Sequence, residues 1–86
     1  MELNYLNYLK LPRLLDLQEP LSKPEEHDEM LFIVIHQVYE LWFKLLLHEF
    51  EKIKRDLSGN DLFGAIAGFK RVRTVMKTLV GQLDIL

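Results

Sequence analysis

The sequence predicts an all-α protein, with an N-terminal arm followed by an antiparallel two-helix hairpin that forms part of a larger helical bundle or oligomer. Two apolar stretches support this prediction: residues 27–50 are apolar on nearly every side, and residues 62–83 repeat apolar side chains at heptad spacing. The turn-forming run Ser58-Gly59-Asn60 separates them. Because 49% of the 86 residues are hydrophobic, a rich share for a short chain, we expect some apolar surface to meet a partner or further sequence.

The arm covers residues 1–21, where Pro12 and Pro20 interrupt any long helix. It carries Tyr5 and Tyr8 and five closely spaced leucines, which are Leu9, Leu11, Leu14, Leu15 and Leu17. Terminal segments are ordered only when they are tied down. The arm therefore packs either on its own core or on another subunit.

The long helix is expected to cover residues 22–57. Ser22 and Glu25 fit a capping box with Pro24 in the first turn, and the acidic residues that follow suit a helix N-terminus. A helix of this length is a rod of about 50 Å. A membrane span needs about 20 apolar residues with few charges. The polar residues inside this stretch argue against one; they are His36, Gln37, Glu40 and Lys44.

The second helix is expected over residues 61–86, with Asp61 as its cap. Its predicted seam against the long helix consists of Leu62, Ala65, Phe69, Val72, Met76, Leu79 and Leu83. A basic strip on this helix is either a solvated face or a phosphate contact, and the solvated face is preferred; it consists of Lys70, Arg71, Arg73 and Lys77. The apolar pattern is unfinished at Leu86, so we expect a piece of a longer chain.

Several classes of function are disfavoured by composition. A net charge of −2 gives no general attraction to nucleic acid or anionic lipid. The chain has no cysteine, and no signal peptide, phosphate-binding loop or E-x-x-H motif is apparent, so we expect a soluble intracellular protein. Among the three histidines, His36 is the candidate binding residue because Phe32 and Phe43 share its side of the helix. It is either a hydrogen-bonded core histidine or a group that binds a planar ligand bearing an N–H.

The run HDEMLFIVIHQVYELWFKLLLHE closely resembles the first long helix of the tryptophan 2,3-dioxygenases. The segments 5–11 and 20–22 match that family's N-terminal region, so the resemblance covers essentially the whole chain. It implies an all-α, haem-containing, cytoplasmic homotetramer. It also implies an oxidoreductase of the kynurenine pathway of tryptophan catabolism, which inserts O2 into the indole ring of L-tryptophan and gives N-formylkynurenine.

The resemblance also implies roles for individual residues. His36 falls on the distal histidine that accepts the indole N–H hydrogen bond, and Phe32 on the aromatic residue that packs against the indole. Tyr5, Tyr8 and Leu9 fall on residues that contribute to the active site of a neighbouring subunit. The resemblance therefore favours packing of the arm on another subunit.

Other parts of the family's site are missing from this chain. The family's proximal haem ligand lies downstream of this chain, so no metal ligand is expected here. Leu83 stands where some members carry a tryptophan near the haem. We therefore expect the chain alone to be inactive. The alternative is a non-catalytic helical module that self-associates.

Overall fold

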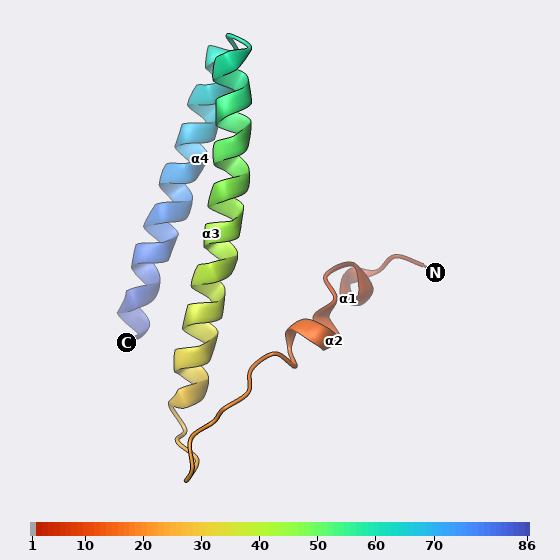
Figure 1. Ribbon diagram of the computed structural model, residues 1–86, viewed down its shortest axis with the longest axis vertical. Helices are drawn as coiled ribbons and strands as arrows, with labels where there is room; N and C mark the ends of the chain where they lie inside the picture. The colour runs from red at the N-terminus through yellow and green to blue at the C-terminus, as the bar shows by residue number, and fades with distance from the viewer. Residues whose placement is uncertain (1) are drawn as a thin grey trace. The chain divides into compact units, whose positions relative to one another are not determined.

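The computed structural model describes residues 2–86 and contains helices and loops, with no strand in that range. The helices are α1 (Tyr5–Tyr8), α2 (Leu11–Leu14), α3 (Glu29–Ser58) and α4 (Leu62–Gly81), followed by the 3₁₀ turn η1 (Gln82–Ile85), as Figure 1 shows. The prediction of an all-α protein is confirmed. The chain divides into two units, residues 1–34 and residues 35–86, and each is described by itself.

The arm contains two single-turn helices with local hydrogen bonds. The Asn7 backbone N–H donates to Asn4 Oδ1 over 2.9 Å, and the Asn4 N–H donates to Asn7 Oδ1 over 2.8 Å, which caps α1. Lys10 adopts a left-handed conformation (φ 54°) between the two turns. Neither α1 nor α2 buries a residue, so the arm is held by local bonds rather than by a core of its own.

The long helix begins at Glu29, seven residues after the expected start at Ser22, and the predicted Ser22–Glu25 capping box is wrong. The physical reason is a competing set of hydrogen bonds. The backbone N–H groups of Leu21 and Ser22 donate to the Glu29 carboxylate over 2.9 and 3.0 Å, which folds the preceding loop back onto the helix start. The Leu21 bond first, and then the Ser22 bonds, hold the pKa of the Glu29 carboxyl below its ordinary value.

Glu29→Gln is expected to open this loop, because one amide oxygen replaces two carboxylate oxygens. Since the folded-state pKa lies below the unfolded value, the loop should be closed above the ordinary range of glutamate. It should open as the pH falls through the folded-state pKa. Amide hydrogen exchange at Leu21 and Ser22 should become several-fold faster, with helix content unchanged. Glu26→Gln, whose side chain is exposed, is the control, and equal exchange in both variants would contradict this role.

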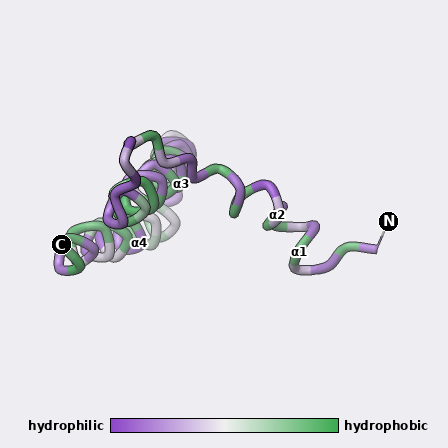
Figure 2. The backbone as a smooth tube through the Cα atoms, turned by 90° about the horizontal axis from the view of Figure 1, so that it is seen from below, coloured by the Kyte–Doolittle hydropathy of each residue, from purple (hydrophilic) through white to green (hydrophobic). Residues whose placement is uncertain are grey.

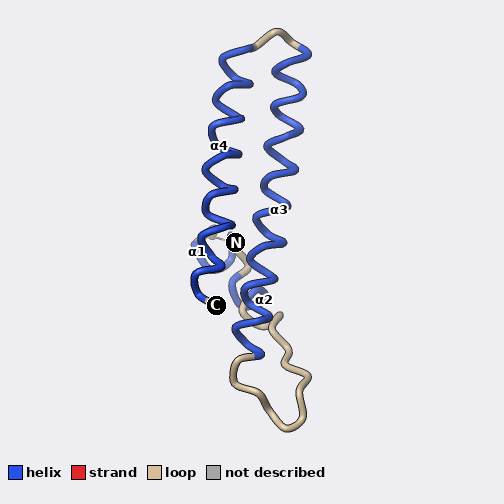
Figure 3. The backbone as a smooth tube through the Cα atoms, turned by 90° about the vertical axis from the view of Figure 1, so that its left-hand side faces the viewer, coloured by secondary structure: helices blue, strands red, loops and turns tan. Residues whose placement is uncertain are grey.

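The helices α3 and α4 run antiparallel and side by side, and the views in Figures 1 and 3 agree on this. The turn between them is closed by Asp61, whose Oδ1 accepts the Gly64 N–H over 2.9 Å. Farther from the turn, the Tyr39 hydroxyl donates to the Leu79 carbonyl over 2.9 Å. These contacts confirm the predicted hairpin.

The seam between α3 and α4 is rotated from the predicted one. Ala65, Val72 and Leu79 are buried as expected, but the other predicted positions Leu62, Phe69, Met76 and Leu83 are more than half exposed. Gly68 and Val75 take the inner positions in their place. Gly68 is the cause, because a Cβ built there would lie 2.6 Å from Ile53 Cγ1. Only a residue without a side chain lets Ile53 lie directly against the α4 backbone. The buried apolar residues of the hairpin are Ile35, Leu46, Ile53, Ala65, Val72, Val75 and Leu79.

Much apolar surface lies outside this small core. Figure 2 shows hydrophobic stretches recurring along both α3 and α4. Within residues 2–86, α3 is the one helix that is long and apolar enough to cross a membrane by length and composition, and 11% of its most apolar stretch is buried. A core helix of a soluble protein has the same length and composition. The argument against a membrane span therefore stays a prediction; it rests on the polar residues His36, Gln37, Glu40 and Lys44.

Candidate functional site

His36 and Phe32 lie one turn apart on α3, and both side chains are exposed. Their i, i+4 spacing places them on one side of the helix. Phe32 is 63% exposed, whereas Ile35 beside His36 points into the seam. His36 is therefore not a core histidine of the hairpin. Phe32 belongs to the unit of residues 1–34 and His36 to the unit of residues 35–86, so their joint contact with one planar aromatic ligand stays a prediction.

The arm residues of the predicted site are also exposed. Tyr5, Tyr8 and Leu9 lie on α1 and its C-cap, at the i, i+3, i+4 positions that share one side of a helix. These three residues belong to the unit of residues 1–34, whereas His36 belongs to the unit of residues 35–86. Their meeting at one site stays a prediction.

The histidines do not gather around a metal position. His36 and His48 are 12 residues apart on α3, which corresponds to about 18 Å along a helix. His27 lies in the loop before α3. Throughout residues 2–86, no three His, Asp or Glu side chains form a group that could hold a metal ion.

The hairpin has two unlike faces, and the contacts of Arg71 identify them. Arg71 lines a hollow together with Gly64, Ala67, Glu49 and Lys52. Four of these five residues come one position before a buried residue in the sequence, so the residues that precede the buried positions of α3 and α4 share one face of the hairpin. The residues that follow the buried positions share the other face. We call this other face the His36 face; it consists of His36, Glu40, Phe43, Leu47 and Phe50 of α3 and Ile66, Phe69, Arg73, Met76 and Val80 of α4, all exposed.

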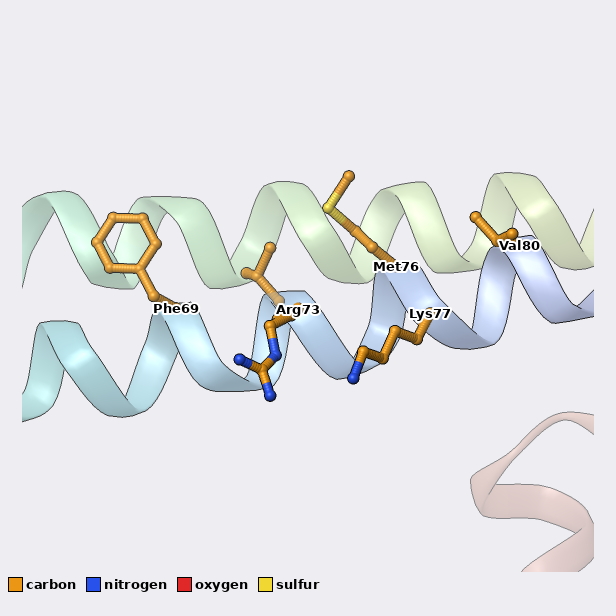
Figure 4. A pocket seen from close by; sticks show the side chains of 6 residues that line it. Phe69, Arg73, Met76, Lys77 and Val80 are labelled. Carbon is orange, nitrogen blue, oxygen red and sulfur yellow. The ribbon is translucent and has the colours of Figure 1, made fainter.

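An open hollow lies along the α4 side of the His36 face (Figure 4). Phe69, Met76 and Val80 point toward the side of α3, while Arg73 and Lys77 point away from it, at the outer edge. Sequence reasoning placed Phe69 and Met76 in the seam and therefore missed this surface. The spacing of Ile66, Phe69, Arg73, Met76 and Val80, all one residue after the buried positions, is the signal that could have found it.

The basic strip does not act as one unit. Arg71 Nη1 lies 3.6 Å from Oε1 of Glu49, which is 8% exposed and belongs to the seam. Arg73 and Lys77 have no ion-pair partner within the described residues. Lys70, Arg73 and Lys77 are thus exposed without an ion pair among the described residues, as a solvated face requires, and Arg71 is the exception. Glu49 was missed because an acid at a seam position gives no special signal in the sequence.

Comparison with known proteins matches the whole chain to one family. The family model described as tryptophan 2,3-dioxygenase matches residues 1–86. A tryptophan 2,3-dioxygenase of Herpetosiphon aurantiacus is 51% identical over 84 residues, which cover 98% of this chain and 32% of that protein. The tryptophan 2,3-dioxygenases of Arthrobacter sp. and Saccharopolyspora erythraea are each 48% identical, over 98% and 99% of this chain and 30% of each relative.

The chain spans about a third of the length of these curated relatives. The match runs through the arm, α3 and α4 alike, which agrees with the resemblance found in residues 27–49. On these grounds the chain belongs to the tryptophan 2,3-dioxygenase family.

Proposed function

We propose that this chain forms the N-terminal part of a cytoplasmic, haem-dependent tryptophan 2,3-dioxygenase, an enzyme of the kynurenine pathway that converts L-tryptophan and O2 to N-formylkynurenine. The observation that carries the proposal is the exposed imidazole of His36 one turn from the exposed ring of Phe32, inside a segment that matches the family. The rest of the site would come from polypeptide beyond this third of the relatives' length.

In this proposal His36 acts as a hydrogen-bond acceptor. A neutral imidazole has one nitrogen that accepts, and the indole N–H of tryptophan is a donor without acceptor capacity. Phe32 would pack against the indole ring, since offset and edge-to-face contacts between aromatic rings are favourable. Tyr5, Tyr8 and Leu9 would complete the pocket from a neighbouring subunit of a homotetramer.

The residues present fit the distal side of a haem. One imidazole at the edge of an apolar, aromatic face suits the side of a planar apolar group where the substrate binds. Haem, when bound, supplies the iron that activates dioxygen. The resemblance to the family implies a proximal iron ligand downstream of this chain, so we assign that ligand to the rest of the polypeptide, beyond this third of the relatives' length.

A chimera tests the proposal. Residues 1–86 replace the matching third of the Herpetosiphon aurantiacus relative, and the product is assayed for N-formylkynurenine and titrated with L-tryptophan. We expect an active chimera in which His36→Ala weakens tryptophan binding by about 2- to 12-fold, the equivalent of one hydrogen bond. His48→Ala, also exposed on α3, should bind tryptophan as the parent does. An active chimera that is equally insensitive to both substitutions would refute the role of His36.

The chain alone should be inactive, because it supplies one side of the site. No N-formylkynurenine is expected from residues 1–86 with haemin, ascorbate and L-tryptophan. A haemin titration should give no saturable, shifted Soret band. A shifted band that His36→Ala abolishes would show that this segment assembles a haem site of its own.

A further inference from the structure

We propose that Glu29 is a positioning residue of the tryptophan site, because its carboxylate holds the first turn of α3 in place and, with that turn, the ring of Phe32. This role rests on the proposed function, in which Phe32 packs against the indole ring. It adds the group that keeps the ring in position, which lies outside the surface that would contact tryptophan.

The Glu29 carboxylate binds the loop before α3 through both of its oxygens. Oε2 accepts the Leu21 N–H over 2.9 Å, and Oε1 accepts the Ser22 N–H over 3.0 Å. Two bonds from successive residues fix the orientation of the carboxylate as well as its distance from the loop. Glu29 is accordingly half-buried, whereas every other residue from 19 to 32 is exposed. The carboxylate is therefore a fixed link between the loop and the start of α3.

Phe32 lies on the turn of α3 that this link holds. It is the fourth residue of the helix, and its N–H donates to the carbonyl of Asp28, just before the helix, over 3.1 Å. Residues three apart, as Glu29 and Phe32 are, share one side of a helix. The first turn of a helix frays readily. Unwinding it here would carry Glu29 away from the loop and break both bonds, so these bonds oppose fraying of the turn that carries Phe32.

The position of this turn affects how well the ring of Phe32 can bind a ligand. Phe32 is 63% exposed, so packing covers little of its surface. The apparent affinity of a site falls in proportion to the time its binding conformation is populated. Loss of the Glu29 bonds should therefore weaken tryptophan binding, and by no more than loss of the Phe32 ring itself.

Hydrogen exchange of the 86-residue chain tests the link between Glu29 and the turn. Glu29→Gln leaves one oxygen for two N–H groups, and its NH2 group faces the other donor. We expect exchange of the Phe32 N–H to become several-fold faster, with exchange at His48, farther along α3, unchanged. Glu26→Gln is the matched control. Equal exchange at Phe32 in the parent and in Glu29→Gln would overturn the proposal, even if the loop itself opened.

Tryptophan binding by the active chimera tests the role of Glu29 in the site. Glu29→Gln should raise the dissociation constant and KM for L-tryptophan by about 2- to 12-fold, the range of one aromatic contact. The value of kcat should not change, because the ring contacts the ground state and the transition state alike. Glu26→Gln should behave as the parent. A lower kcat with KM unchanged would contradict a positioning role for Glu29.

A double variant shows whether Glu29 acts through Phe32. In the Phe32→Ala chimera, Glu29→Gln should have no further effect on tryptophan binding, because the ring that it positions is absent. Additive losses would mean that Glu29 acts through another part of the chain and would refute the proposal.

The role of Glu29 and the role of His36 fail separately. If His36→Ala weakens tryptophan binding and Glu29→Gln does not, the role of Glu29 is refuted and the proposed function stands. If Glu29→Gln weakens binding through Phe32 and His36→Ala does not, the role of His36 is refuted and the role of Glu29 stands.

Discussion

Ile53→Ala is expected to lower the free energy of unfolding of the hairpin by about 2–5 kcal/mol. Ile53 is 3% exposed and lies in the core cluster with Leu46, Ala65 and Val72. The core is small, so the loss of three buried carbon atoms removes a large share of its apolar contact. The Gly68 backbone on the other side cannot move in to fill the space, because it is part of the α4 hydrogen-bond ladder.

Urea unfolding followed by circular dichroism measures this effect. Leu41→Ala is the control, since Leu41 is on the same helix but 54% exposed, and its cost should stay within about 0.5 kcal/mol. Both variants should keep the parent m-value. Equal midpoints for the two variants would mean that Ile53 does not occupy the core position described above.

Gly68→Val is expected to be the second most damaging substitution. The added Cβ would lie 2.6 Å from Ile53 Cγ1 and 3.1 Å from Ile53 Cδ1, so either the Ile53 side chain or the two helices must shift. Overpacking of this kind costs about 1–3 kcal/mol, and the gain in helix propensity over glycine offsets only a part of it. Gly81→Val is the matched control, because a Cβ at Gly81 meets no atom within 4 Å and should leave stability unchanged or higher.

The two substitutions should also be coupled. In the Gly68→Val, Ile53→Ala double variant, the valine side chain enters the space that the isoleucine vacates. Its loss of stability should therefore be smaller than the sum of the single losses, by about 0.5–3 kcal/mol. Additive losses would show that Gly68 is required for something other than room for Ile53.

The main features of the fold follow from patterns within the sequence. Heptad spacing and the turn after Ser58 were enough to predict two antiparallel helices, because both depend on neighbouring residues. The start of α3 could not be predicted in this way. The Glu29 carboxylate accepts hydrogen bonds from backbone N–H groups seven and eight residues away, and these bonds displace the local Ser22 cap. The rotation of the seam was missed because apolar size suggested Phe69, whereas close approach required Gly68.

The candidate site could be predicted only in part, for a related reason. The i, i+4 relation of Phe32 and His36 is a property of one helix, and the structure shows both on α3. Whether His36 was buried or exposed depended on which side of α3 faces α4, and residue spacing left both open. The roles of Tyr5 and Tyr8 depend on a second subunit, which no pattern within one chain encodes.

The buried carboxylate of Glu49 has a consequence for how the hairpin assembles. An apolar seam alone tolerates sliding, because one heptad layer resembles the next. Sliding α4 by seven residues in either direction would bring Gly64 or Thr78 opposite Glu49 in place of Arg71. A carboxylate that is 8% exposed would then lose its ion pair with Arg71, which is costly. The ion pair of Glu49 thus favours one register of the two helices over registers that are shifted by a heptad.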